Sequence, residues 1–181
     1  MFIWSFVAHD LLPRGEIGVR ELSNEQPVLD NLKANLTDDG LYMYPGGGHP
    51  KNGTRQEKAA AMKAVFEKVA SGPSGLILYH PTRPLSFAKL LCVEFGKELL
   101  VSILAVFLLA QTRINSFGGR VGFIFVTGIV AALGTNVSYW NWYGFPGNYT
   151  ASYIFMEIVG FLCAGVVAGC VLGKSPVAAA P

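Results

Sequence analysis

The sequence has few charged residues, and they are unevenly placed. Only 14% of its 181 residues are charged, whereas about a quarter are charged in a typical soluble domain. Residues 1–85 carry nine Lys/Arg and nine Asp/Glu, while residues 86–181 carry five and three. The balanced charge of the first part argues against a nucleic-acid surface and against a polybasic lipid-binding patch. The first part therefore has a composition suited to water and the second a composition suited to an apolar environment. We expect no nucleic-acid partner.

Cysteine and histidine are equally scarce, with three residues of each. Cys92, Cys163 and Cys170 fall in or beside apolar runs, and no CxxC or Cys/His spacing indicates a disulfide framework or a metal site. Among the histidines, only His9 could reach membrane depth and ligate a haem or a chlorophyll. A lone histidine is more typical of a hydrogen-bonded helix end. We therefore predict no cofactor and no metal, while contact with a pigment, a haem or a quinone stays open.

Long apolar runs dominate the second part of the chain. Three of them, at about 87–111, 121–140 and 153–172, are long enough to cross about 30 Å of hydrocarbon. Short connections make neighbouring spans antiparallel. The prediction is an all-α membrane protein, with a three-helix transmembrane bundle in residues 86–174 and a C-terminal tail at 175–181.

The first twelve residues are also apolar but are too short to cross a bilayer. They lack the basic n-region and the small-residue cleavage site of a secretory signal. Pro13 and Gly15 end any helix that forms there. We expect either that a fourth span continues upstream of Met1, or that residues 1–12 form a partial segment that dips into the membrane beside the other helices.

Residues 13–85 have the composition of an extramembrane region that is mostly helical. Pro27 can open a helix that runs to Leu36. Thr54 and Glu57 have the spacing of a capping box for a second helix, from about 55 to 70. Turn residues occur at Asp39-Gly40 and Pro45–Gly48, and a short strand-like run occurs at Leu76–Tyr79. Large apolar side chains are few, so we expect this region to be stabilised by packing against the membrane helices.

The basic residues beside the spans favour one orientation. Arg113, Arg120 and Lys174 fall on the same side of the predicted bundle. The positive-inside rule places this side, and with it the C-terminus, in the cytoplasm. Residues 13–85 are then periplasmic, in a multi-pass protein of a bacterial inner membrane.

Small residues recur every four positions in the third span, at Gly165, Gly169 and Gly173. This spacing lets two helix backbones approach closely within a bilayer. Weaker pairs occur in the second span: Gly118/Gly122 and Gly128/Ala132. We predict helix packing through these positions, against a helix of this chain or of another subunit.

The ionisable residues inside the predicted first and third spans include Glu94, Lys97, Glu98 and Glu157. Charged groups at membrane depth are costly, and they usually pair or face a polar cavity. Glu94 and Glu98 lie one helical turn apart, and Lys97 can pair with Glu94. One interpretation is a proton, ion or substrate site, to which His9 could contribute. The other is a helix end whose charges reach the headgroups.

The densest aromatic run contains Tyr139, Trp140, Trp142 and Tyr143. Trp and Tyr prefer the bilayer interface, because their rings are apolar while the N–H or O–H group stays hydrated. An interfacial anchor explains this run, and a pigment or quinone surface is the alternative.

Several strings along most of the chain resemble a group of small bacterial multi-span membrane proteins with no assigned activity. They are Ala8-His9, Leu12-Pro13, Gly15-Glu16, Tyr79-His80-Pro81 and Trp140–Pro146. The resemblance implies that the opening segment belongs to a full N-terminal span. It implies no activity, and it assigns no functional residue.

These observations favour a non-catalytic accessory or structural subunit of a larger membrane complex, with a bioenergetic complex as one option. Its expected partners are membrane lipids and other membrane protein subunits. The alternative is a small transporter or membrane enzyme that uses Glu94, Glu98 and Glu157.

Overall fold

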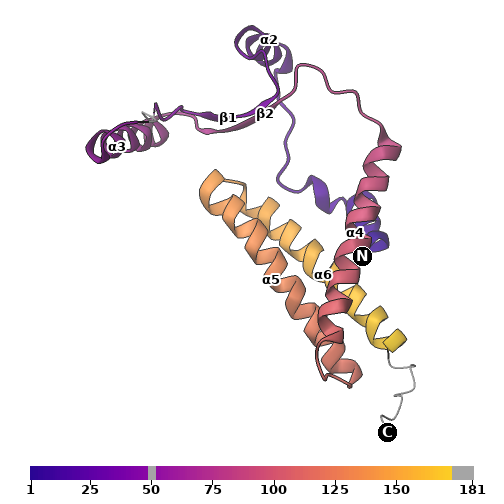
Figure 1. Ribbon diagram of the computed structural model, residues 1–181. Helices are drawn as coiled ribbons and strands as arrows, with labels where there is room; N and C mark the ends of the chain where they lie inside the picture. Colours follow the sequence, from indigo (N-terminus) through magenta and orange to yellow (C-terminus); the bar gives the residue numbers. More distant parts are fainter. Residues whose placement is uncertain (49–51, 173–181) are drawn as a thin grey trace. The chain divides into compact units, whose positions relative to one another are not determined.

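The computed structural model describes residues 1–48 and 52–172, and this part of the chain is mostly helical (Figure 1). It divides into two compact units. Unit 1 contains residues 1–20 together with those from Ser86 onward, and unit 2 contains Glu21–Leu85. The prediction of a mostly helical chain is confirmed.

Three long helices form most of unit 1: α4 (Phe87–Ala110), α5 (Phe117–Tyr143) and α6 (Gly147–Leu172). Ser86 and Ser116 cap the first two, because each hydroxyl accepts a hydrogen bond from a backbone amide in the first turn. Gly144 ends α5 in the left-handed conformation, with φ of 70°. The turn to α6 is consequently shorter than predicted, and the aromatic run belongs to the last turns of α5.

Within the described residues, α5 and α6 are the two helices long and apolar enough to cross a membrane. By contrast, the first half of α4 carries Lys89, Glu94, Lys97 and Glu98. Its uninterrupted apolar stretch, residues 99–110, measures only about 18 Å at 1.5 Å per residue. Run length alone therefore predicted α4 as a span, although its charges set it apart from α5 and α6.

Close contact between α5 and α6 depends on glycine. A Cβ atom built on Gly165 would lie 3.1 Å from the backbone oxygen of Val121, and one on Gly128 would lie 2.4 Å from the Cβ of Phe161. The two helices lie side by side (Figure 1). Gly169 contacts the ring of Phe117 in the same interface. A hydrogen atom in place of a side chain is what allows this approach.

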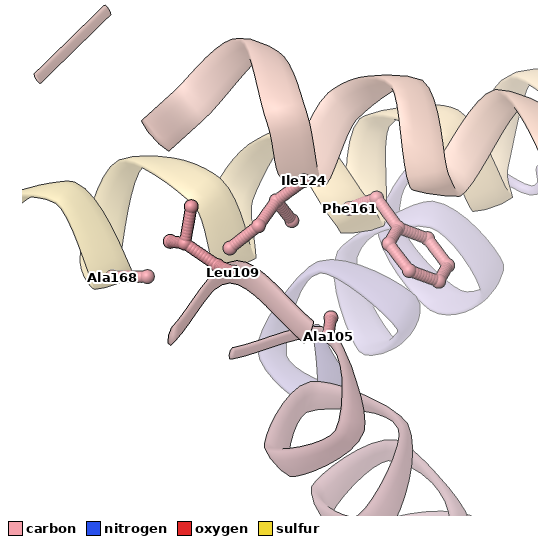
Figure 2. Close-up of a cluster of buried hydrophobic side chains, with 5 residues drawn as sticks. All are labelled: Ala105, Leu109, Ile124, Phe161 and Ala168. Carbon is pink, nitrogen blue, oxygen red and sulfur yellow. The ribbon is translucent and has the colours of Figure 1, made fainter. Parts of the chain in front are cut away.

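Five buried side chains form the core of unit 1. Figure 2 shows them where the three long helices meet: Ala105 and Leu109 of α4, Ile124 of α5, and Phe161 and Ala168 of α6. Only the last turns of α4 contribute to this cluster. Most large apolar side chains of α4 are exposed.

The N-terminal segment packs against α4 and α6. It contains α1 (Phe2–Phe6), the wide helical turn η1 (Val7–Leu11) and the 3₁₀ turn η2 (Arg14–Glu16). The indole nitrogen of Trp4 donates a hydrogen bond of 2.8 Å to the backbone oxygen of Met156. The hydroxyl of Ser152 donates one of 2.9 Å to the backbone oxygen of Arg14. These contacts fix residues 1–16 along α6.

Unit 2 contains two helices and a two-stranded antiparallel ribbon. The elements are α2 (Glu25–Asn35), β1 (Gly40–Tyr44), α3 (Arg55–Ser71) and β2 (Gly75–Tyr79). The capping box of α3 forms as predicted, since the Thr54 hydroxyl accepts from the Glu57 amide and the Glu57 carboxylate accepts from the Thr54 amide. Strand β1 was not predicted, because Asp39-Gly40 has the composition of a turn. In the structure, Gly40 pairs with Tyr79.

No described residue of unit 2 is buried. A two-stranded ribbon is marginally stable in water without a packed face. One face of this ribbon leaves Leu41, Met43 and Leu78 with 63%, 59% and 67% of their surfaces exposed. Unit 2 therefore has ordered elements but almost no hydrophobic core of its own.

Candidate functional site

A charged group occupies the middle of α4. The Lys97 ammonium lies 2.6 Å from Oε1 of Glu94 and 3.0 Å from Oε1 of Glu98. Helical spacing explains the pair with Glu94, because residues three positions apart share a face, whereas Glu98 directly follows Lys97 in the sequence. Lys97 and Glu94 are exposed, whereas Glu98 retains 9% of its surface. One ammonium thus joins two carboxylates, one of which is buried between helices.

Two further polar side chains reach this region from the other long helices. The Asn136 amide, on α5, donates a hydrogen bond of 3.2 Å to Oε2 of Glu157, on α6. The same amide donates to the backbone oxygen of Ala132, one turn earlier. We refer to these polar residues of the three long helices together as the polar cluster: Glu94, Lys97, Glu98, Asn136 and Glu157.

Asn136 had not been predicted as a member of this cluster. Its position in an apolar helix is the signal that could have identified it, since an amide at membrane depth needs a hydrogen-bonding partner. The sequence alone gives no way to match that amide with a carboxylate 21 positions later.

The second carboxylate oxygen of Glu98 has an unusual environment. Oε2 is buried and accepts no hydrogen bond from the described residues. Buried carboxylate oxygens normally have a donor. An oxygen of this kind can hold a proton, or it can accept a hydrogen bond from a donor that a ligand or a partner supplies. No group of three or more His, Cys, Asp or Glu side chains among the described residues has the arrangement of a metal site.

His9 lies outside the polar cluster. It is exposed on η1, and its ring packs against the α-carbon of Gly15 and lies 6.1 Å from the ring of Tyr153. These contacts give the imidazole a place in the packing of the N-terminal segment. Among the described residues, His9 belongs to no group of three or more His, Cys, Asp or Glu side chains that could hold a metal ion.

The predicted packing glycines fall into two groups. Gly165 and Gly169 face α5, whereas a Cβ built on Gly118 or Gly122 would meet no atom within 4 Å. Gly173 lies outside the described residues. The first two glycines therefore serve packing within the chain, and Gly118 and Gly122 leave open space on α5.

The predicted interfacial aromatics are all exposed: Tyr139, Trp140, Trp142 and Tyr143. Tyr139 begins a row of neighbouring rings that continues through Phe145 and Tyr149 to Tyr153, with centroids 4.4–5.5 Å apart. This row joins the end of α5 to the start of α6, where exposed aromatic rings are typical of a bilayer interface.

Comparison with known proteins adds no relative: no family model, curated protein or solved structure matches the chain.

Proposed function

We propose that this chain is a non-catalytic subunit of a larger membrane complex in a bacterial inner membrane. The main support for this proposal is that none of the described residues of unit 2 is buried. A region that holds regular elements without a core gains stability when a partner covers its apolar side chains. Assembly into a complex would supply that cover.

The proposed membrane arrangement has three spans. Helices α5 and α6 have the required length and composition, and α4 joins them through its packing at Ala105 and Leu109. Arg113, in the loop before α5, and Arg120, in the first turn of α5, lie on the cytoplasmic side under the positive-inside rule. The C-terminus lies on the same side, and unit 2 lies in the periplasm.

The ribbon is the proposed contact with a protein partner. Strands β1 and β2 contain no charged residue, and they pair only with each other in the described part of the chain. Each strand therefore offers an edge to which an extended segment could add. An apolar groove of about 490 Å³ lies beside it, with Leu32, Tyr42 and Ile77 among its lining residues. Backbone pairing and an apolar groove together suit an extended, apolar peptide segment.

Site-specific photo-crosslinking in native membranes tests this proposal. A photoreactive amino acid replaces Met43 or Leu78 on the exposed face of the ribbon, and Lys33 on α2 is the exposed control position. We expect positions 43 and 78 to crosslink to the same protein, which also co-purifies with the unmodified chain, and position 33 to give much less of this product. Crosslinks to lipid alone, or equal products from all three positions, would contradict the proposal.

A second function is supported by the polar cluster. Asn136 and Glu157 are hydrogen-bonded between α5 and α6, and a buried carboxylate oxygen of Glu98 on α4 has no donor among the described residues. A small transporter or membrane enzyme could use these groups to hold a proton or a small cation. If this function is correct, the chain should show a measurable transport flux or enzymatic turnover. The Glu98→Gln variant should abolish that activity while the amount of folded protein stays unchanged.

A further inference from the structure

Helix α3 has an apolar stripe that nothing described in the structure covers. Met62, Phe66 and Val69 recur at the spacing of one helical face, with exposures of 50%, 66% and 43%. No residue of the 17-residue helix is buried. Most helices in proteins are stabilised by packing of an apolar face against a neighbour and not by helix propensity alone. The stripe therefore calls for a surface that covers it.

The charges of α3 are arranged around this stripe. At 3.6 residues per turn, Lys63 lies roughly 95° to one side of the centre of Met62, Phe66 and Val69, and Lys68 roughly 125° to the other. Glu57 and Glu67 lie roughly 145° and 135° from that centre, while Arg55 and Lys58 lie on the same side of the helix as the stripe, one to two turns before it. Residues 1–85 have no net charge, but α3 holds four basic and two acidic residues and keeps two of its lysines at the borders of the stripe. Lysines at such borders can extend toward phosphate groups while the stripe is buried.

Unit 2 is also attached to a membrane at both ends. Its chain continues into unit 1 at Arg20 and at Ser86, and unit 1 contains the two helices that could cross a bilayer. This double attachment gives α3 a high effective concentration at the bilayer surface. A short apolar stripe is then sufficient, although it would bind a membrane weakly as a free peptide.

We propose that α3 lies in the plane of the bilayer interface, with Met62, Phe66 and Val69 among the acyl chains and with Lys63 and Lys68 at anionic headgroups. A bilayer provides negative charge on both sides of an inserted helix, which matches lysines on both borders of the stripe. The inference rests on the proposed membrane-spanning role of unit 1. It is independent of the protein contact at the ribbon.

Spin-label accessibility in lipid nanodiscs tests this position. The full chain, with Cys92, Cys163 and Cys170 replaced by alanine, carries one label at Phe66→Cys or at Ala64→Cys. Position 64 lies on the opposite side of the helix. In nanodiscs of phosphatidylcholine and phosphatidylglycerol, position 66 should collide more with oxygen than with a water-soluble nickel complex, and position 64 should show the reverse. Lys63→Gln with Lys68→Gln should reduce this difference, whereas Glu67→Gln should not.

A label at Val130→Cys, on an exposed position of α5, distinguishes failure of the proposed α3 position from failure of the membrane-spanning role of unit 1. A lipid signature at 130 with aqueous signatures at both 64 and 66 would overturn the position proposed for α3. An aqueous signature at 130 would instead overturn the membrane-spanning role of unit 1. A label at 66 protected from both reagents would indicate a protein partner on the stripe, which also overturns the proposal. Lysine substitutions without effect would overturn the role of anionic headgroups.

Discussion

Substitution of Gly128 by alanine tests the packing of α5 against α6 most directly. The added Cβ would lie 2.4 Å from Cβ and 2.5 Å from Cγ of Phe161. Carbon atoms in favourable contact are about 3.5 Å or more apart, so the two groups must separate by roughly 1 Å. Rotation of the Phe161 side chain cannot move its Cβ, and the backbones must therefore shift. Such overpacking costs about 1–3 kcal/mol, from which the higher helix propensity of alanine recovers up to about 1 kcal/mol.

Gly134→Ala is the matched control, because a Cβ there would meet nothing within 4 Å on the same helix. It should leave the free energy of unfolding unchanged or raise it slightly. Unfolding in mixed micelles of mild detergent and dodecyl sulfate, followed by tryptophan fluorescence, measures both variants. Equal stability of Gly128→Ala and Gly134→Ala would refute the close α5–α6 contact.

Three further outcomes follow from the same structure. Gly169→Ala should cost less than Gly128→Ala in the same unfolding assay, because its Cβ would meet the outer ring atoms of Phe117, an exposed side chain that can rotate. Trp4→Phe removes a hydrogen bond to a backbone oxygen of α6 and should destabilise the N-terminal segment by about 1 kcal/mol, which faster amide exchange in residues 1–12 would report. Hydrogen bonds from the amide and hydroxyl of Thr54 lower the pKa of Glu57 below 4.5. The helix stability that this carboxylate contributes is therefore complete above pH 4.5 and is lost as the pH falls through the lowered pKa. Amide-exchange protection factors in the first turn of α3 should consequently fall at acid pH. The Thr54→Ala variant lacks the hydroxyl of the capping box, so its protection factors should not show this fall.

The sequence predicts those parts of the fold that depend on local signals. Apolar run length located α5 and α6, and the Thr54–Glu57 spacing located the start of α3. Strand β1 was missed because its partner lies more than thirty positions away. So short a segment has no sequence pattern of its own that would indicate strand pairing. The contact of Gly128 with Phe161 likewise depends on how two helices meet, which the spacing of glycines alone does not determine.

The candidate site could be predicted only in part, for a related reason. The i, i+3 spacing indicated the ion pair of Lys97 with Glu94, because helical geometry fixes which residues on one helix are neighbours, whereas the pair of Lys97 with the adjacent Glu98 was not predicted. The meeting of Asn136 with Glu157 depends on the rotation of α5 and α6 about their axes. Gly128 and Gly165 allow the close approach of α5 and α6, the two helices that the Asn136–Glu157 hydrogen bond joins.

The two candidate functions make opposite predictions for α4 and the polar cluster. Residues 99–110 span only about 18 Å, so a membrane-crossing α4 also places Glu94, Lys97 and Glu98 within or near the hydrocarbon. Together with Glu157 the cluster has three carboxylates and one ammonium.

A cluster with this excess of carboxylates is stable at membrane depth only if it gains positive charge. A transporter would supply a proton or a cation that exchanges, and a complex would supply a basic side chain from a partner helix. Glu157→Gln keeps the hydrogen-bonding shape and removes one charge. Under the subunit function it should lower recovery of the native complex and leave the isolated chain folded, which co-purification and tryptophan fluorescence measure. Loss of flux with full recovery of the complex would instead establish the cluster as a transport site.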